Sequence, residues 1–96
     1  MKKFMFLYKG FMPPTPEIGQ AWMEWFDRVG ESMADSGNPM TAGVEVRPDG
    51  VQQLQLGSDS LTGYSIINAD SLDAAIELAK TNPMITSVVV HELARM

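Results

Sequence analysis

Two titratable residues in the second half of the chain carry side chains suited to proton transfer. His91 is the single histidine, and imidazole changes charge near neutral pH, as a general base must. A partner has to orient the ring. The adjacent Glu92 points to the opposite face of a strand, which leaves Asp59 or Glu45. The alternative interpretations are a hydrogen-bonded or solvated His91 at a strand end and an Asp59 that caps backbone N–H groups in a turn.

A second set of residues suits ligand binding. Arg47 can hold a carboxylate through paired N–H groups. Together with Tyr64, and with Tyr8 from another strand, it would recognise a carboxylate or phenolate in a cleft. Trp22 and Trp25 would line a pocket for a hydrophobic or aromatic ligand, with some polar character from their indole N–H groups. The alternatives are a solvated Arg47 before a turn and tryptophans that belong to an ordinary core.

The composition excludes several classes of site. The chain has no cysteine and one histidine, which excludes disulfides, thiolate metal sites, a cysteine nucleophile and a histidine-rich metal site. It has no P-loop, no glycine-rich dinucleotide motif and no nucleophile elbow. We therefore expect neither a metal nor a cofactor. Twelve Asp and Glu against seven Lys and Arg give a net charge of −5, which argues against a nucleic-acid partner.

The length predicts one domain over residues 1–96. Met1–Lys3 and the apolar residues that follow imitate a signal peptide, but Lys9 interrupts the apolar run after five residues. A signal sequence needs about 7–15 apolar residues. No other stretch reaches the length of a transmembrane helix. We therefore expect a cytoplasmic protein with no membrane partner.

Hydrophobic periodicity indicates the elements that position these residues. A first helix is predicted over 16–36, from its start at Thr15–Pro16 to a left-handed glycine at Gly37. A second helix is predicted from Asp70–Ser71 to Asn82. Strands are predicted over 2–9, 40–47, 61–68 and 86–93, with a short returning strand over 51–56.

This order predicts an α+β domain of the ferredoxin-like type, β-α-β-β-α-β, with an antiparallel sheet and an extra small hairpin in the middle. The first and last strands and Ile66–Ile67 are apolar on both faces. Two helices on one side of the sheet would cover only one of these faces. A large apolar surface left in water is unusual for a soluble monomer. We therefore expect a homodimer in which a second copy covers the sheet, as in a barrel shared by two chains.

Four segments follow one another in a distinctive order: FMFLYKG, AWMEWFDRVGESMADSGNPM, TGYSIINADSLDAAIELAK and SVVVHEL. In their order and character, over most of the chain, they resemble the small YCII-related, or DGPF-type, proteins. The resemblance implies a ferredoxin-like fold assembled as a dimeric α+β barrel. The Asp-Gly-Pro-Phe signature is replaced here by LGSDS at 56–60. The first-helix histidine of some relatives is also absent, so the resemblance assigns no catalytic residue.

Three functions are compatible with these patterns. The first is a small-molecule-binding or accessory homodimer with an apolar cleft between sheet and helices, for a small hydrophobic or aromatic ligand. The second is a cofactor-independent enzyme, of lyase or isomerase type, that moves a proton on a small cyclic or aromatic substrate through His91, Asp59, Arg47 and Tyr64. The third is a structural or regulatory dimer without a ligand. The missing first-helix histidine favours binding over catalysis.

Overall fold

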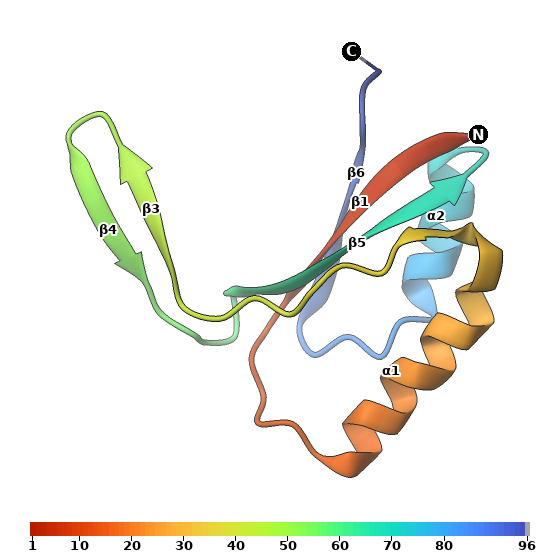
Figure 1. Ribbon diagram of the computed structural model, residues 1–96, viewed down its shortest axis with the longest axis horizontal. Helices are drawn as coiled ribbons and strands as arrows, with labels where there is room; N and C mark the ends of the chain where they lie inside the picture. The colour runs from red at the N-terminus through yellow and green to blue at the C-terminus, as the bar shows by residue number, and fades with distance from the viewer. Residues whose placement is uncertain (96) are drawn as a thin grey trace.

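The computed structural model describes residues 1–95 as an α+β chain (Figure 1). Its helices are α1 (Pro16–Val29), the short 3-10 helix η1 (Gly30–Ser32) and α2 (Leu72–Lys80). Its strands are β1 (Lys2–Lys9), β2 (Met33–Asp35), β3 (Gly43–Arg47), β4 (Gly50–Leu54), β5 (Leu61–Ala69) and β6 (Ser87–Glu92). An antiparallel sheet has the order β2-β5-β1-β6, and β3 and β4 form a separate hairpin. None of the described helices is long and apolar enough to cross a membrane.

Both long helices begin where the capping residues predict. The Thr15 Oγ1 atom accepts the Ile18 N–H at 3.2 Å at the start of α1, and Pro16 takes the first helical position. The Ser71 Oγ atom accepts the Ala74 N–H at 3.1 Å at the start of α2. These hydroxyls satisfy backbone donors that have no partner inside the helix.

The first helix ends seven residues earlier than predicted. Gly30 has a φ of 57°, and its N–H donates to the carbonyl of Phe26, which closes the helix after Val29. The chain then enters β2, which pairs with β5 at the edge of the sheet. Met33 still packs against the core, so the apolar spacing continues although the helix does not. The predicted strand over 40–47 is shortened to β3 and lies in the hairpin instead of the main sheet.

Gly37 does take the predicted left-handed conformation, with a φ of +75°. It does so in the turn after β2, where its N–H donates to the Asp35 Oδ1 atom at 2.8 Å. A Cβ atom at this position would lie 1.7 Å from the carbonyl oxygen of Tyr64. Only glycine therefore allows the chain to cross so close to β5.

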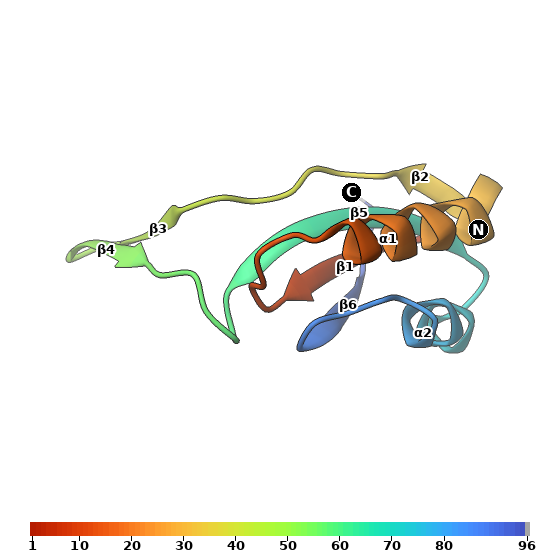
Figure 2. The ribbon, with the colours of Figure 1, turned by 90° about the horizontal axis from the view of Figure 1, so that it is seen from below.

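The core lies between one face of the sheet and the two helices. Phe4, Phe6 and Tyr8 alternate along β1 toward this side. The complete buried apolar cluster is Phe4, Phe6, Tyr8, Trp25, Val29, Ile67, Ala69, Ala75 and Ala79. Because α1 and α2 both contribute to it, they cover the same face. Figure 2 shows the β3–β4 hairpin extending away from both helices.

Candidate functional site

An aromatic cluster joins β1 to α1 inside the chain. The rings of Tyr8 and Trp22 meet edge to face with centroids 4.7 Å apart, and Trp25 lies 6.0 Å from Trp22 and 6.3 Å from Tyr8. Trp25 is 2% exposed, whereas Trp22 is half-buried and lies at the border of the cluster. Three predicted binding residues are thus brought together, and one of them has an accessible edge.

The phenol of Tyr8 is held in a short polar chain. Its hydroxyl donates to the Ser65 Oγ atom at 2.8 Å, and Ser65 donates to the Ser36 carbonyl at 2.8 Å. Burial raises the pKa of Tyr8 to about 12, and the hydrogen bond to Ser65 offsets only part of that effect. Tyr8 is therefore a neutral hydrogen-bond donor whose proton is already engaged, and it is poorly suited to act as a base.

A second polar feature borders the cluster on the α2 side. The Trp25 Nε1–H donates to the Thr81 Oγ1 atom at 3.0 Å and to the Leu78 carbonyl at 3.4 Å. The next residue, Asn82, is 6% exposed, and within the described chain its side-chain nitrogen and oxygen have no hydrogen-bond partner. A buried amide of this kind normally meets a water molecule or a ligand group. The sequence pattern predicts only that a helix ends at Asn82, and no local pattern indicates that its side chain is buried.

His91 and Asp59 do not form a catalytic pair with any described group. His91 is exposed and lies opposite Met5 on the face of the sheet that the helices leave uncovered. Glu92 points to the other face, as predicted, and lies 3.8 Å from the Lys2 ammonium. Asp59 is exposed in a loop where Ser60, rather than Asp59, accepts the Gly57 N–H at 2.9 Å.

Arg47 and Tyr64 are placed on different parts of the molecule. Arg47 lies at the end of β3 on the protruding hairpin, exposed, with its Nε–H donating to Glu45 Oε2 at 2.6 Å. Tyr64 lies on β5 and points away from the helices, whereas Tyr8 points toward them. The predicted cleft formed by Arg47, Tyr64 and Tyr8 is therefore not assembled within the chain.

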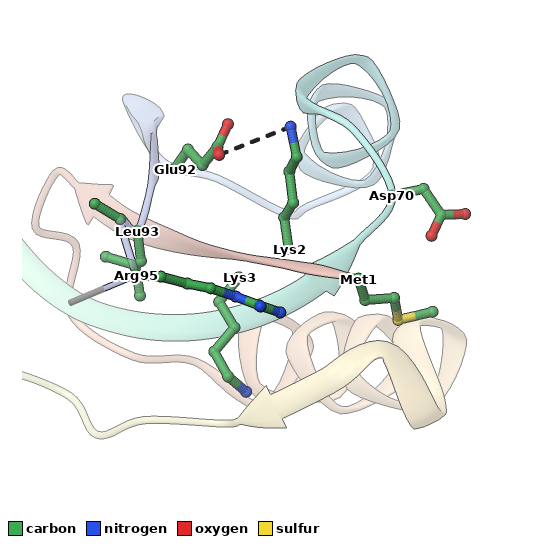
Figure 3. Close-up of a pocket in the computed structure, with 8 residues that line it drawn as sticks. Met1, Lys2, Lys3, Asp70, Glu92, Leu93 and Arg95 are labelled. Atoms are coloured by element: carbon green, nitrogen blue, oxygen red, sulfur yellow. Dashed lines mark ion pairs between the residues drawn. The ribbon is translucent and has the colours of Figure 1, made fainter.

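Two hollows lie elsewhere on the surface. One, of about 510 Å³, lies between the chain ends, and Figure 3 shows the ion pair of Lys2 with Glu92 beside it. Its lining is Met1, Lys2, Lys3, Asp70, Glu92, Leu93, Ala94 and Arg95. The other, of about 330 Å³, lies at the base of the hairpin, lined by Ala42, Gly43, Val44, Gln53 and Leu54. None of the predicted site residues lines either hollow.

The uncovered face of the sheet forms a continuous apolar surface. Leu7 lies between Tyr64 and Val89 in one row, and the next row places Met5 between Ile66 and His91. We call the five half-buried residues Met5, Leu7, Tyr64, Ile66 and Val89 the open face. They alternate along their strands with residues that face the helices.

The described residues contain no group of three His, Cys, Asp or Glu side chains that could hold a metal ion. Comparisons of the chain with protein-family models, with curated proteins and with solved structures gave no match.

Proposed function

We propose that this chain is a YCII-like homodimer that binds a small hydrophobic or aromatic molecule, either as a binding protein or as an accessory module. The sheet order β2-β5-β1-β6, with both helices on one side, supports the ferredoxin-like arrangement. In the proposed dimer the open faces of two copies are turned toward each other. This arrangement would give the shared barrel that the resemblance implies.

The surface area of the single chain supports association. The chain exposes 6763 Å², whereas a compact monomer of this mass exposes roughly 5,500 Å². Its radius of gyration is 14.3 Å, against about 12.5 Å for a compact domain of this length. The excess area of about 1,300 Å² exceeds the roughly 800 Å² that each partner buries in a standard interface.

The unpartnered amide of Asn82 is the observation that carries the binding proposal. It follows Thr81, which accepts from Trp25, at the α2 side of the aromatic cluster. A ligand site usually combines apolar walls with a few polar groups that fix orientation. The half-buried Trp22 would supply the apolar wall, and Asn82 the polar group. The ligand class is a small aromatic or hydrophobic molecule with a polar end that both donates and accepts a hydrogen bond.

The enzyme alternative has less support. Efficient proton transfer needs an acid or base within hydrogen-bond reach of the substrate and oriented by a partner. His91 and Asp59 are both exposed, and no described side chain orients either of them. Binding requires no such pair, so it remains the better-supported function.

Native mass spectrometry of gently purified protein tests the proposal. We expect a dimer that carries extra mass, which is lost on denaturation and identifies the ligand. If the protein carries no extra mass, it would then be screened for binding of small aromatic acids and amides by the change in its tryptophan fluorescence. Asn82→Ala and Trp22→Leu are expected to weaken binding at least tenfold, while Met23→Leu, on the exposed side of α1, leaves it unchanged. Equal affinity in all three variants, or no ligand in either experiment, would contradict the binding proposal.

A further inference from the structure

The β3–β4 hairpin is amphipathic, and no other strand among residues 1–95 pairs with it. We call Gly43–Leu54 the arm. Register places Val46 opposite Val51, and Val44 opposite Gln53, so three valines share one face. Val44 is 55% exposed, Val46 is 74% exposed and Val51 is 66% exposed. The other face carries the exposed Glu45–Arg47 ion pair.

An isolated two-stranded hairpin is marginally stable in water at best. Strands with one apolar face normally pack that face against another layer. The arm instead forms a sheet of its own, and every residue in both strands is exposed. Its outer edges also leave a row of backbone N–H and C=O groups unpaired, which invites pairing with another chain. The arm therefore needs a cover that the described chain does not supply.

Backbone hydrogen bonds hold the segments on either side of the arm against the main sheet and the loop after β1. On one side, the Met40 N–H donates to the Thr62 carbonyl at 2.9 Å; on the other, the Phe11 N–H donates to the Gly57 carbonyl at 3.0 Å. Pro39 also bridges to Gly63. The segments before and after the arm are thus tied to β5 and to the loop after β1, and the arm projects outward from the sheet (Figure 1).

The open face and the arm are complementary surfaces on the same chain. The open face is apolar at its centre, as is the valine face of the arm. On β1 the apolar residues are flanked by Lys3 and Lys9, which share their side of the strand, and the turn of the arm carries Asp49. Each copy has one arm and one open face, so a two-fold axis pairs both sets at once and closes the assembly at two chains.

We propose that each arm packs its valine face, Val44, Val46 and Val51, against the open face of a second copy of this chain. This inference rests on the proposed homodimer and adds a reciprocal exchange of arms to it. The partner's valines then cover the row of Leu7, Tyr64 and Val89 at one end of the open face, while the partner's own open face covers the rest. The excess surface of the isolated chain is reduced because both exposed apolar surfaces are buried together.

Cross-linking between chains tests the exchange directly, because the protein has no cysteine of its own. Val46→Cys protein and Leu7→Cys protein, one of them labelled with heavy nitrogen, are mixed by joint refolding and treated with a short bismaleimide. Peptide mass spectrometry then identifies which chains are joined. We expect a Val46-to-Leu7 cross-link between chains of different label. The matched control replaces Val46→Cys by Met23→Cys, at a similarly exposed position on α1 (66% against 74% for Val46), and should give at least tenfold less product.

The possible outcomes separate this inference from the proposed function. A dimer that gives no more Val46-to-Leu7 product than the control would overturn the arm exchange and leave the homodimer standing. A dimer cross-linked mainly between two Val46→Cys chains would overturn it as well, because the arms would then lie on each other. A monomer in native mass spectrometry would overturn both.

A second variant set removes the apolar character of the arm without changing its strand preference. Val44, Val46 and Val51 are replaced together by threonine, which is also β-branched and favours strands. We expect the dimer dissociation constant to rise at least tenfold while the far-ultraviolet circular dichroism stays the same. Gln52→Thr, on the opposite face of the arm, is the control and should leave the constant unchanged. An unchanged constant in the triple variant would contradict the exchange.

Discussion

The two faces of β1 are built from the same strand and have opposite environments. Phe4 and Phe6 point toward the helices and are fully buried. Met5 and Leu7 alternate with them, point the other way and stay half-buried. Both faces have the same neighbouring strands, β5 and β6. Only the cover differs, because α1 and α2 lie on one side.

The helix-covered face stabilises the folded chain, and the open face leaves apolar surface for association. Full burial of a phenylalanine contributes about 1.5–3 kcal/mol relative to exposure, so the helix-covered face holds the monomer together. The open face is almost as apolar, yet within the chain it gains only part of that energy. In the dimer that we propose, covering of this face by a second copy would supply the remainder. The chain thus folds with one face of the sheet and, on our proposal, assembles with the other.

The sharpest test of this contrast replaces neighbouring residues on opposite faces of β1. Phe6→Ala should lower the free energy of unfolding by about 3–5 kcal/mol, because it opens a cavity in a packed core. Leu7→Ala should cost about 1 kcal/mol at protein concentrations where the chain is monomeric, since half-buried surface loses less. Urea unfolding of both variants measures the difference. Equal losses would mean that the chain itself covers both faces.

Two glycines in different surroundings test how closely the turn after β2 approaches β5. Gly37→Ala should cost about 2–4 kcal/mol, because the backbone is left-handed and the new Cβ atom would collide with the Tyr64 carbonyl. Gly19→Ala, in α1 with nothing within 4 Å, should instead stabilise the protein by roughly 1 kcal/mol. Thermal unfolding of the two variants provides the comparison. A tolerated Gly37→Ala would contradict the close crossing of β5.

The pH dependence of stability reports on the polar end of the covered face. The pKa of Tyr8 is raised from 10.0 to about 12 in the folded chain. Between these values the unfolded phenol loses its proton while the folded one keeps it, so stability falls as pH rises. The slope from this group is about 1.4 kcal/mol per pH unit. The free energies of unfolding of wild type and Tyr8→Phe, measured from pH 9 to 12, isolate the contribution of this phenol. If the two free energies changed with pH in parallel, the phenol would not be buried.

The smallest expected effect lies on the arm. The Glu45–Arg47 pair is exposed on both sides, and exposed ion pairs contribute about 0–1 kcal/mol. Arg47→Ala should therefore change the free energy of unfolding by less than about 0.5 kcal/mol and leave ligand affinity unaltered. A loss of ligand binding in this variant would mean that Arg47 contacts the ligand, which would contradict its position on the hairpin, away from the proposed ligand site.

Helix starts and strand faces could be predicted because their causes are local. Thr15 and Ser71 cap the helices through hydroxyls three residues from their donors, and alternation along β1 separates its two faces. The end of α1 could not be predicted in this way. Met33 continues the helical spacing but reaches the core from a strand, and Gly30 ends the helix through a backbone angle that composition does not reveal.

The candidate site could be predicted only in part, because some of its contacts depend on local spacing and others on packing between distant segments. Trp22 and Trp25 belong together through helical spacing, and Tyr8 joins them because β1 packs on α1. The proposed grouping with Arg47 failed, since it assumed that the strand over 40–47 enters the main sheet. Asn82 was missed because its burial depends on how α2 and the following turn pack against distant parts of the chain.

The mass of the wild-type protein in solution shows whether a second copy covers the open face. Sedimentation equilibrium over a range of concentrations should give twice the chain mass of 10.6 kDa. Leu7→Asp should return it to the mass of one chain while the circular dichroism remains that of a folded α+β protein. A wild-type chain that stays monomeric across the micromolar range would mean that no second copy covers the open face.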